Sequence, residues 1–79
     1  MEPITVYATP WCGDCHRARR VLERLGARYR WIDVEQDAEA EAAAVRLNGG
    51  QRKVPTILFP DGSVLVEPSD DELEAKLAT

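Results

Sequence analysis

The sequence has 79 residues, of which 44% are hydrophobic and 30% are charged, as is usual for one small globular domain. Its formal net charge of −4 argues against nucleic acid as the main partner, because binding to phosphates requires a clear excess of basic residues. No stretch approaches the length of a transmembrane helix, and the start of the chain is acidic at Glu2, unlike a secretory signal peptide. We therefore expect one domain, residues 1–79, that works in the cytoplasm as a monomer, with no membrane partner.

The first half of the chain alternates between strand and helix patterns. Alternating β-branched and aromatic residues predict a strand at residues 4–8. A 3.6-residue apolar period then predicts a helix that begins at Cys12 and ends before Gly26. Alternation at residues 27–35 predicts a second strand, and an alanine-rich stretch with early acidic residues predicts a helix over residues 37–48. The apolar residues expected to face the core from these two helices are Cys15, Ala18, Val21 or Leu22, Leu25, Ala40, Ala43, Ala44 and Leu47.

The second half of the chain predicts a hairpin and a closing helix. Residues 55–59 and 64–67 form short apolar strands on either side of a turn at residues 60–63. Ser69 and Glu72 form an S-x-x-E capping box at the start of the last helix. The residues of that helix expected to face inward are Leu73 and Leu77.

The resulting order of elements is β-α-β-α-β-β-α. A strand–helix–strand unit favours a parallel pair of strands with a right-handed crossover, and the closing hairpin adds antiparallel strands. We therefore expect an α/β fold in which a four-stranded mixed sheet has helices on both faces.

The only two cysteines and the only histidine lie together as Cys12, Cys15 and His16, in the pattern C-x-x-C-H. This pattern attaches c-type haem in exported cytochromes, while C-x-x-C alone marks a thioredoxin-like redox pair. Covalent haem usually needs a second axial ligand, but the chain has no second histidine and its one methionine is Met1. The residues therefore favour a redox pair.

The predicted helix makes the two cysteines unequal. Cys12 lies at the helix N-terminus, where unpaired amides and the helix dipole favour the thiolate, and Arg17 adds positive charge nearby. Asp14 acts in both directions, because it stabilises the helix start but disfavours a neighbouring thiolate. Cys15 lies one turn further on the same face, so we expect Cys12 to attack and Cys15 to resolve.

Several motifs together resemble the thioredoxin fold. They are the first strand followed by "TPWCGDC", then "KVPT", then "DGS" and a capped final helix, and their compact spacing over the whole chain is similar to the glutaredoxin branch. The resemblance implies that Cys12 is the nucleophile and Cys15 the resolving cysteine. It also implies a cis Val54–Pro55 bond beside the cysteines, with the Val54 backbone offered to an extended substrate as an added strand.

The same resemblance implies residues that bind a small thiol. Trp11 can wall a groove beside the nucleophile, although ordinary partial burial also explains it. Arg52 and Lys53 can attract carboxylates of the thiol, and the alternative is a solvated loop. Ser69 and Asp70 fall where glutaredoxins hold the carboxylate of a peptide thiol, and the alternative for Ser69 is the capping box alone.

Two departures from the family pattern bear on the thiol. Glutathione-using glutaredoxins usually have a lysine where this chain has Thr9, and Gly-Gly where it has Glu67 and Pro68. The pattern is more similar to mycoredoxins, so the expected co-substrate is mycothiol, bacillithiol or glutathione, with no bound cofactor and with mixed-disulfide proteins as partners. The main alternative is a glutaredoxin-like electron donor of ribonucleotide reductase that is served by thioredoxin reductase.

Two further interpretations belong to other classes of protein. Cys12 thiolates from two chains, together with external thiols, can hold an iron–sulfur cluster in some glutaredoxins, although one chain offers no complete ligand set. A redox-inert binding module would leave Cys12, Cys15 and the Val54–Pro55 pair unexplained.

Overall fold

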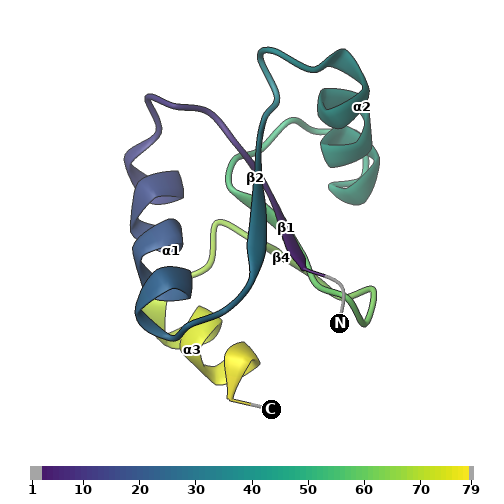
Figure 1. The fold of residues 1–79 in the computed structure, drawn as a ribbon. Helices are drawn as coiled ribbons and strands as arrows, with labels where there is room; N and C mark the ends of the chain where they lie inside the picture. The colour runs from purple at the N-terminus through teal and green to yellow at the C-terminus, as the bar shows by residue number, and fades with distance from the viewer. Residues whose placement is uncertain (1–2, 79) are drawn as a thin grey trace.

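The computed structural model describes residues 3–78, which form a four-stranded sheet with helices on both faces (Figure 1). The elements follow the expected order β-α-β-α-β-β-α. They are β1 (Ile4–Ala8), α1 (Gly13–Arg24), β2 (Tyr29–Asp33), α2 (Ala38–Leu47), β3 (Thr56–Leu58), β4 (Val64–Val66) and α3 (Asp70–Leu77). The predicted α/β class and mixed sheet are therefore confirmed.

The strand order in the sheet is β2-β1-β3-β4. β1 pairs parallel with β2 and antiparallel with β3, and β3 pairs antiparallel with β4. Because β1 and β2 are parallel, their C-terminal ends meet at one edge of the sheet. The loops that leave this edge carry the cysteine pair after β1 and a short acidic segment after β2.

The two faces of the sheet bury different amounts of apolar surface. α1 and α3 cover one face, and the residues fully or nearly fully buried there include Val6, Leu22, Ile57 and Leu73. α2 covers part of the other face through a second, smaller cluster, which is centred on Ala44. The apolar side chains of β1, β2 and β3 alternate between these two clusters, as the period of a strand requires.

Most predicted boundaries lie within two residues of the observed ones, but two predicted core residues are exposed. Leu25 is 45% exposed and Leu47 is 37% exposed. Each stands at the C-terminal end of its helix, directly before a turn in which Gly26 or Gly49 has a positive φ. The helical repeat no longer determines burial there, because the turn carries the chain away from the helix axis.

No helix within residues 3–78 is both long enough and apolar enough to span a membrane.

Candidate active site

Cys12 is the N-cap residue of α1. Its backbone is extended, with φ −86° and ψ 116°, and its Sγ accepts a hydrogen bond from the amide of Cys15 at 3.2 Å. A serine or aspartate oxygen usually fills this position, so the sulfur takes the place of a capping oxygen. The free amides and the dipole at this end of α1 favour negative charge on that sulfur.

Cys15 has the opposite environment. Its side chain is completely buried in the larger core cluster, and both cysteines are free thiols in this structure. Burial, followed by the hydrogen bond with Cys12, raises the pKa of Cys15 to about 12. The neighbouring Asp14 carboxylate adds to this rise. Cys15 is therefore a protonated thiol at neutral pH and Cys12 is the sulfur with access to a substrate.

The loop before β3 closes the other side of the site. The Val54–Pro55 peptide bond is cis, as the resemblance implied, and Pro55 is buried. The Cys12 Sγ lies 3.9 Å from the Val54 carbonyl oxygen, within the weak hydrogen-bonding range of a thiol. The Pro55 carbonyl accepts a hydrogen bond from the Glu67 amide at 2.9 Å, so the segment after β4 also meets this loop.

The segment between β4 and α3 contains a strained residue. Glu67 has a φ of +48°, in the left-handed region that glycine adopts at little cost. This is one of the two positions at which the family pattern has Gly-Gly. The structure thus keeps, with a glutamate, a backbone conformation that suits glycine.

Trp11 is the most exposed large hydrophobic residue in the part of the chain described, at 68% exposure. Ordinary partial burial therefore does not explain it. Its Nε1 donates a hydrogen bond to Glu35 Oε1 at 2.9 Å, which orients the ring. Trp11 directly precedes Cys12 in the chain. The ring is available to contact a molecule that approaches Cys12.

Arg52 is not free to act as a simple surface charge. It forms ion pairs with Glu35 at 3.6 Å and with Glu41 at 3.2 Å. Lys53 is exposed, and its side chain makes no ion pair within residues 3–78. Of the two basic residues predicted to attract a thiol carboxylate, Arg52 is thus already paired with acidic side chains, whereas Lys53 has no such ion pair within the described residues.

Ser69 and Asp70 lie at the start of α3. Ser69 and Glu72 form the predicted capping box, with the Glu72 amide 3.1 Å from Ser69 Oγ and the Ser69 amide 2.9 Å from Glu72 Oε1. These bonds lower the pKa of Glu72. Asp70 forms an ion pair with Arg17 at 3.0 Å, and Arg17 also reaches Asp14 at 3.3 Å. Arg17 therefore joins the N-terminal turns of α1 and α3 instead of standing free beside Cys12.

His16 is partly exposed and contacts both the loop before α1 and β2. Its Nε2 donates to the Pro10 carbonyl oxygen at 2.6 Å, and its ring stacks on Trp31 with centroids 5.4 Å apart. Thr9 is completely buried and uncharged, and its Oγ1 has no hydrogen-bond partner within the described residues. The loop between β1 and α1 is thus fixed by burial of Thr9 and by the hydrogen bond from His16 of α1 to Pro10.

Sequence reasoning missed Glu35 and Glu41, which contact Trp11 and Arg52. The signal available for Glu35 was its place directly after the second predicted strand, since parallel strands end at the same edge of a sheet. Nothing in the local sequence indicates that Glu41 turns toward Arg52.

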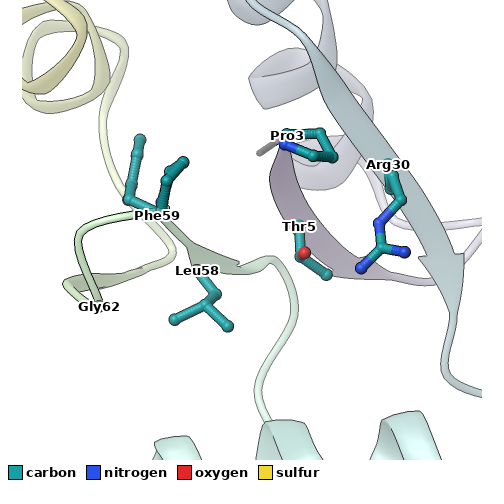
Figure 2. A pocket seen from close by; sticks show the side chains of 7 residues that line it. Pro3, Thr5, Arg30, Leu58, Phe59 and Gly62 are labelled. Atoms are coloured by element: carbon teal, nitrogen blue, oxygen red, sulfur yellow. The ribbon is translucent and has the colours of Figure 1, made fainter. Parts of the chain in front are cut away.

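A hollow at the other end of the sheet has no connection with the cysteines. It is lined by Pro3 and Thr5 at the start of β1, by Arg30 and by Leu58 (Figure 2). The cysteine pair follows the opposite end of β1, so this hollow belongs to a different part of the surface. No group of three or more His, Cys, Asp and Glu side chains suited to a metal ion occurs between residues 3 and 78.

Comparison with known proteins shows the family of this chain. The sequence matches the glutaredoxin family model over residues 4–64. A protein of Mycobacterium tuberculosis that is named as a glutaredoxin is 43% identical over 74 residues, covering 94% of this chain and 88% of the relative. Mycoredoxin 1 of Corynebacterium glutamicum is 39% identical over 77 residues, covering 98% of this chain and 95% of the relative.

A solved structure of a glutaredoxin-like protein has a similar fold. The glutaredoxin-like protein NrdH-redoxin from Escherichia coli has a TM-score of 0.76 and 28% identity, covering 94% of this chain and 93% of that one. The fold and the cysteine pair at a helix N-terminus define a thiol–disulfide redox protein with the thioredoxin fold. Within that class, the chain belongs to the glutaredoxin family.

Proposed function

We propose that this protein is a thiol–disulfide oxidoreductase that reduces mixed disulfides between proteins and a small thiol. The observation that carries the proposal is the position of Cys12. Its sulfur caps α1, accepts the Cys15 amide at 3.2 Å and lies against the Val54 carbonyl, while Cys15 is buried beneath it. One accessible sulfur and one protected sulfur suit a two-step exchange.

In the first step, the Cys12 thiolate attacks the small-thiol sulfur of the mixed disulfide. A disulfide forms between Cys12 and the small thiol, the original S–S bond breaks, and the protein thiolate leaves with the electron pair. The helix N-terminus favours this step because it stabilises Cys12 as the attacking anion, and in the next step it favours Cys12 as the leaving group.

Two routes complete the cycle. In one, a second small thiol attacks its own sulfur on Cys12, forms a small-thiol disulfide and releases the Cys12 thiolate. In the other, Cys15 attacks Cys12 Sγ, the bond between Cys12 and the small thiol breaks, and the departing small thiolate takes up the Cys15 proton. The Cys12–Cys15 disulfide that forms is then reduced by two further small thiols or by a reductase, which completes the cycle. The raised pKa of Cys15 keeps it protonated until this moment, so it does not compete for the substrate.

The co-substrate we propose is mycothiol, bacillithiol or glutathione. The similarity to Mycoredoxin 1 supports a thiol other than glutathione, as do the uncharged Thr9 and the Glu67–Pro68 pair. In this proposal the Trp11 ring and Val54 form the contact surface for the mixed disulfide, and Lys53, Ser69 and Asp70 lie at its border. We further propose that the protein acts as a cytoplasmic monomer.

A second candidate function is that of an electron donor reduced directly by thioredoxin reductase. The similarity to NrdH-redoxin favours it, because that structure is described as having a thioredoxin-like activity profile. Both candidates use Cys12 and Cys15, and they differ in the source of electrons and in the disulfide that is reduced.

The test is NADPH-coupled reduction of the oxidised protein by each source separately. We would compare mycothiol, bacillithiol and glutathione, each with its reductase, against thioredoxin reductase alone. Turnover through a small thiol is the expected result and names the co-substrate. Turnover with thioredoxin reductase alone would establish the second candidate, and turnover with none of them would contradict both.

Two cysteine variants test the roles within the site. We expect Cys12→Ser to abolish release of protein thiol from a mixed disulfide, because the only other cysteine, Cys15, is completely buried. Cys15→Ser keeps the first step and the small-thiol route, so it retains monothiol reduction. The released protein thiol is measured by mass spectrometry, and full activity of Cys12→Ser would disprove the assignment.

A further inference from the structure

Four residues next to the cysteine pair form a connected polar cluster, which we call the Arg52 cluster: Trp11, Glu35, Glu41 and Arg52. Trp11 Nε1 donates to Glu35 Oε1 at 2.9 Å. Arg52 Nη2 lies 3.6 Å from Glu35 Oε2, and Arg52 Nε lies 3.2 Å from Glu41 Oε2. The cluster therefore links the residue before the nucleophile to the loop that leads into Val54 and Pro55.

The fold places these groups together from four separate segments. Trp11 follows β1 and Glu35 follows β2, and the parallel pairing brings both to the same edge of the sheet. Glu41 lies in the first turn of α2, and Arg52 follows that helix on the way to β3. Glu35 uses one carboxylate oxygen for each partner, so a single side chain holds both the tryptophan and the arginine.

The ion pairs of Arg52 occupy the N–H donors that a thiol with a carboxylate would need. An arginine recognises a carboxylate best through two parallel N–H donors, but Arg52 already directs donors on two sides of its guanidinium to Glu35 and Glu41. A carboxylate that approached Arg52 would meet both acidic side chains at close range, and like charges repel. Asp70, the acidic group predicted to take part in thiol binding, is likewise paired with Arg17.

Lys53 remains as a positive charge near the site. It is exposed and forms no ion pair in the part of the chain that the structure describes. A lysine ammonium is a point charge with no fork geometry, so it does not replace the paired donors of Arg52.

We propose that Glu35 and Glu41 determine thiol specificity by occupying Arg52, so that the site favours a small thiol without a carboxylate over one that carries it. This inference rests on the proposed function, because it assumes that a small-thiol mixed disulfide reaches Cys12. Glu35 and Glu41 are positioning residues here, since they act on the thiol through Arg52.

The test uses two thiols that differ only at the carboxyl group, N-acetylcysteine and N-acetylcysteine amide. Each is attached to the same cysteine peptide as a mixed disulfide, and the rate of peptide release by the reduced protein is measured. The readout is the ratio of the two rate constants, because a general loss of activity or stability changes both alike. Comparing this ratio between variants also cancels the intrinsic difference in reactivity of the two thiols.

We expect Glu41→Gln to raise the relative rate with N-acetylcysteine about two- to fivefold, the range for loss of one partly exposed ion pair. Glu39→Gln is the matched control, because it removes the same charge from an exposed position on the same helix. A combined Glu35→Gln and Glu41→Gln variant should raise the ratio further, because Arg52 then has neither acidic partner. Glutamine at position 35 still offers an oxygen that accepts the hydrogen bond from Trp11. Adding Arg52→Gln to that variant should return the ratio to its original value.

The possible outcomes separate this inference from the proposed function. If the unmodified protein releases the peptide from neither mixed disulfide, the proposed function fails. If it releases the peptide from both mixed disulfides, and Glu41→Gln leaves the ratio of rate constants unchanged or Glu39→Gln changes it equally, the specificity role of the Arg52 cluster is wrong. If Arg52→Gln leaves the gain of the combined variant intact, the effect does not pass through Arg52 and the inference is overturned.

Discussion

Cys12 and Cys15 lie one helical turn apart but have different chemistry. Cys12 is the N-cap of α1, and its sulfur accepts an amide hydrogen bond at a surface that substrates can reach. Cys15 points into the core and has no exposed surface. The helix repeat places both sulfurs on one face, while the tertiary packing buries the second one. The proposed attack by Cys12 and resolution by Cys15 rest on this difference in environment.

The raised pKa of Cys15 makes the stability of the reduced protein depend on pH. Its pKa is about 12 in the folded protein against an ordinary value of 9.0, so folding favours the neutral thiol. This contribution is complete below about pH 9 and is lost as the pH rises toward the folded pKa. We expect reduced wild type to lose more stability than Cys15→Ala between about pH 8 and about pH 11.

The measurement is urea unfolding of both proteins at the two pH values in the presence of a reductant. The variant serves as the control for lysine and tyrosine groups that titrate in the same range. Equal losses in the two proteins would show that Cys15 is not held in its neutral form by the fold.

At the scale of elements, α3 shows how a short helix is stabilised. It has 8 residues, fewer than an isolated helix needs to be stable in water. The Ser69–Glu72 capping box satisfies amides at its start, and Leu73 is 1% exposed within the core cluster shared with α1. The Arg17–Asp70 ion pair adds a second connection between the two helices. Tertiary contacts therefore hold this helix in place beside the site.

We expect Leu73→Ala to lower the free energy of unfolding by about 3 kcal/mol, because it removes a buried side chain and leaves a cavity. Leu77→Ala on the same helix is the comparison, since Leu77 is only partly buried and its loss should cost clearly less. Both values are obtained from urea unfolding monitored by circular dichroism. Equal costs for the two variants would show that α3 is not anchored through Leu73.

At the scale of the whole molecule, the two faces of the sheet have unequal cores. The cluster under α1 and α3 contains large buried side chains from several elements, whereas the cluster under α2 is built around Ala40, Ala44, Tyr7 and Val34. Alanines let α2 approach the sheet closely but bury little apolar area. The helix that carries Glu41 is therefore held less strongly than the helix that carries the cysteines.

We expect the backbone amides of α2 to exchange with solvent faster than those of α1 and β1. Helices with few buried apolar contacts open locally at lower free energy than the rest of a domain. Hydrogen exchange of the reduced protein, followed by mass spectrometry or NMR, measures this directly. Equal protection in α1 and α2 would mean that the smaller core stabilises its helix as well as the larger one.

The sequence alone was sufficient to predict the elements, their order and the placement of the cysteine pair at a helix N-terminus. The strand and helix periods, the capping box at Ser69 and the N-cap position of Cys12 all depend on residues within a few positions of one another. Such short-range features are encoded locally, because backbone preferences and amide partners act over one or two turns. The cis Val54–Pro55 bond was implied by the resemblance and not by the residues themselves.

Only the tertiary structure decided which charged groups meet. Trp11 and Glu35 are 24 positions apart, and Arg17 and Asp70 are 53 positions apart, yet each pair is in contact. The predicted carboxylate-binding role of Arg52 depended on its being unpaired. The position of Glu35 after β2 indicates that it lies near the site, but the sequence contains no local sign that Glu41 pairs with Arg52. The order of strands in the sheet and the paths of the loops determine these contacts, and both result from packing of the whole chain. For the same reason Leu25 and Leu47 fit the helical period but remain exposed, since burial depends on which neighbouring element covers a helix end.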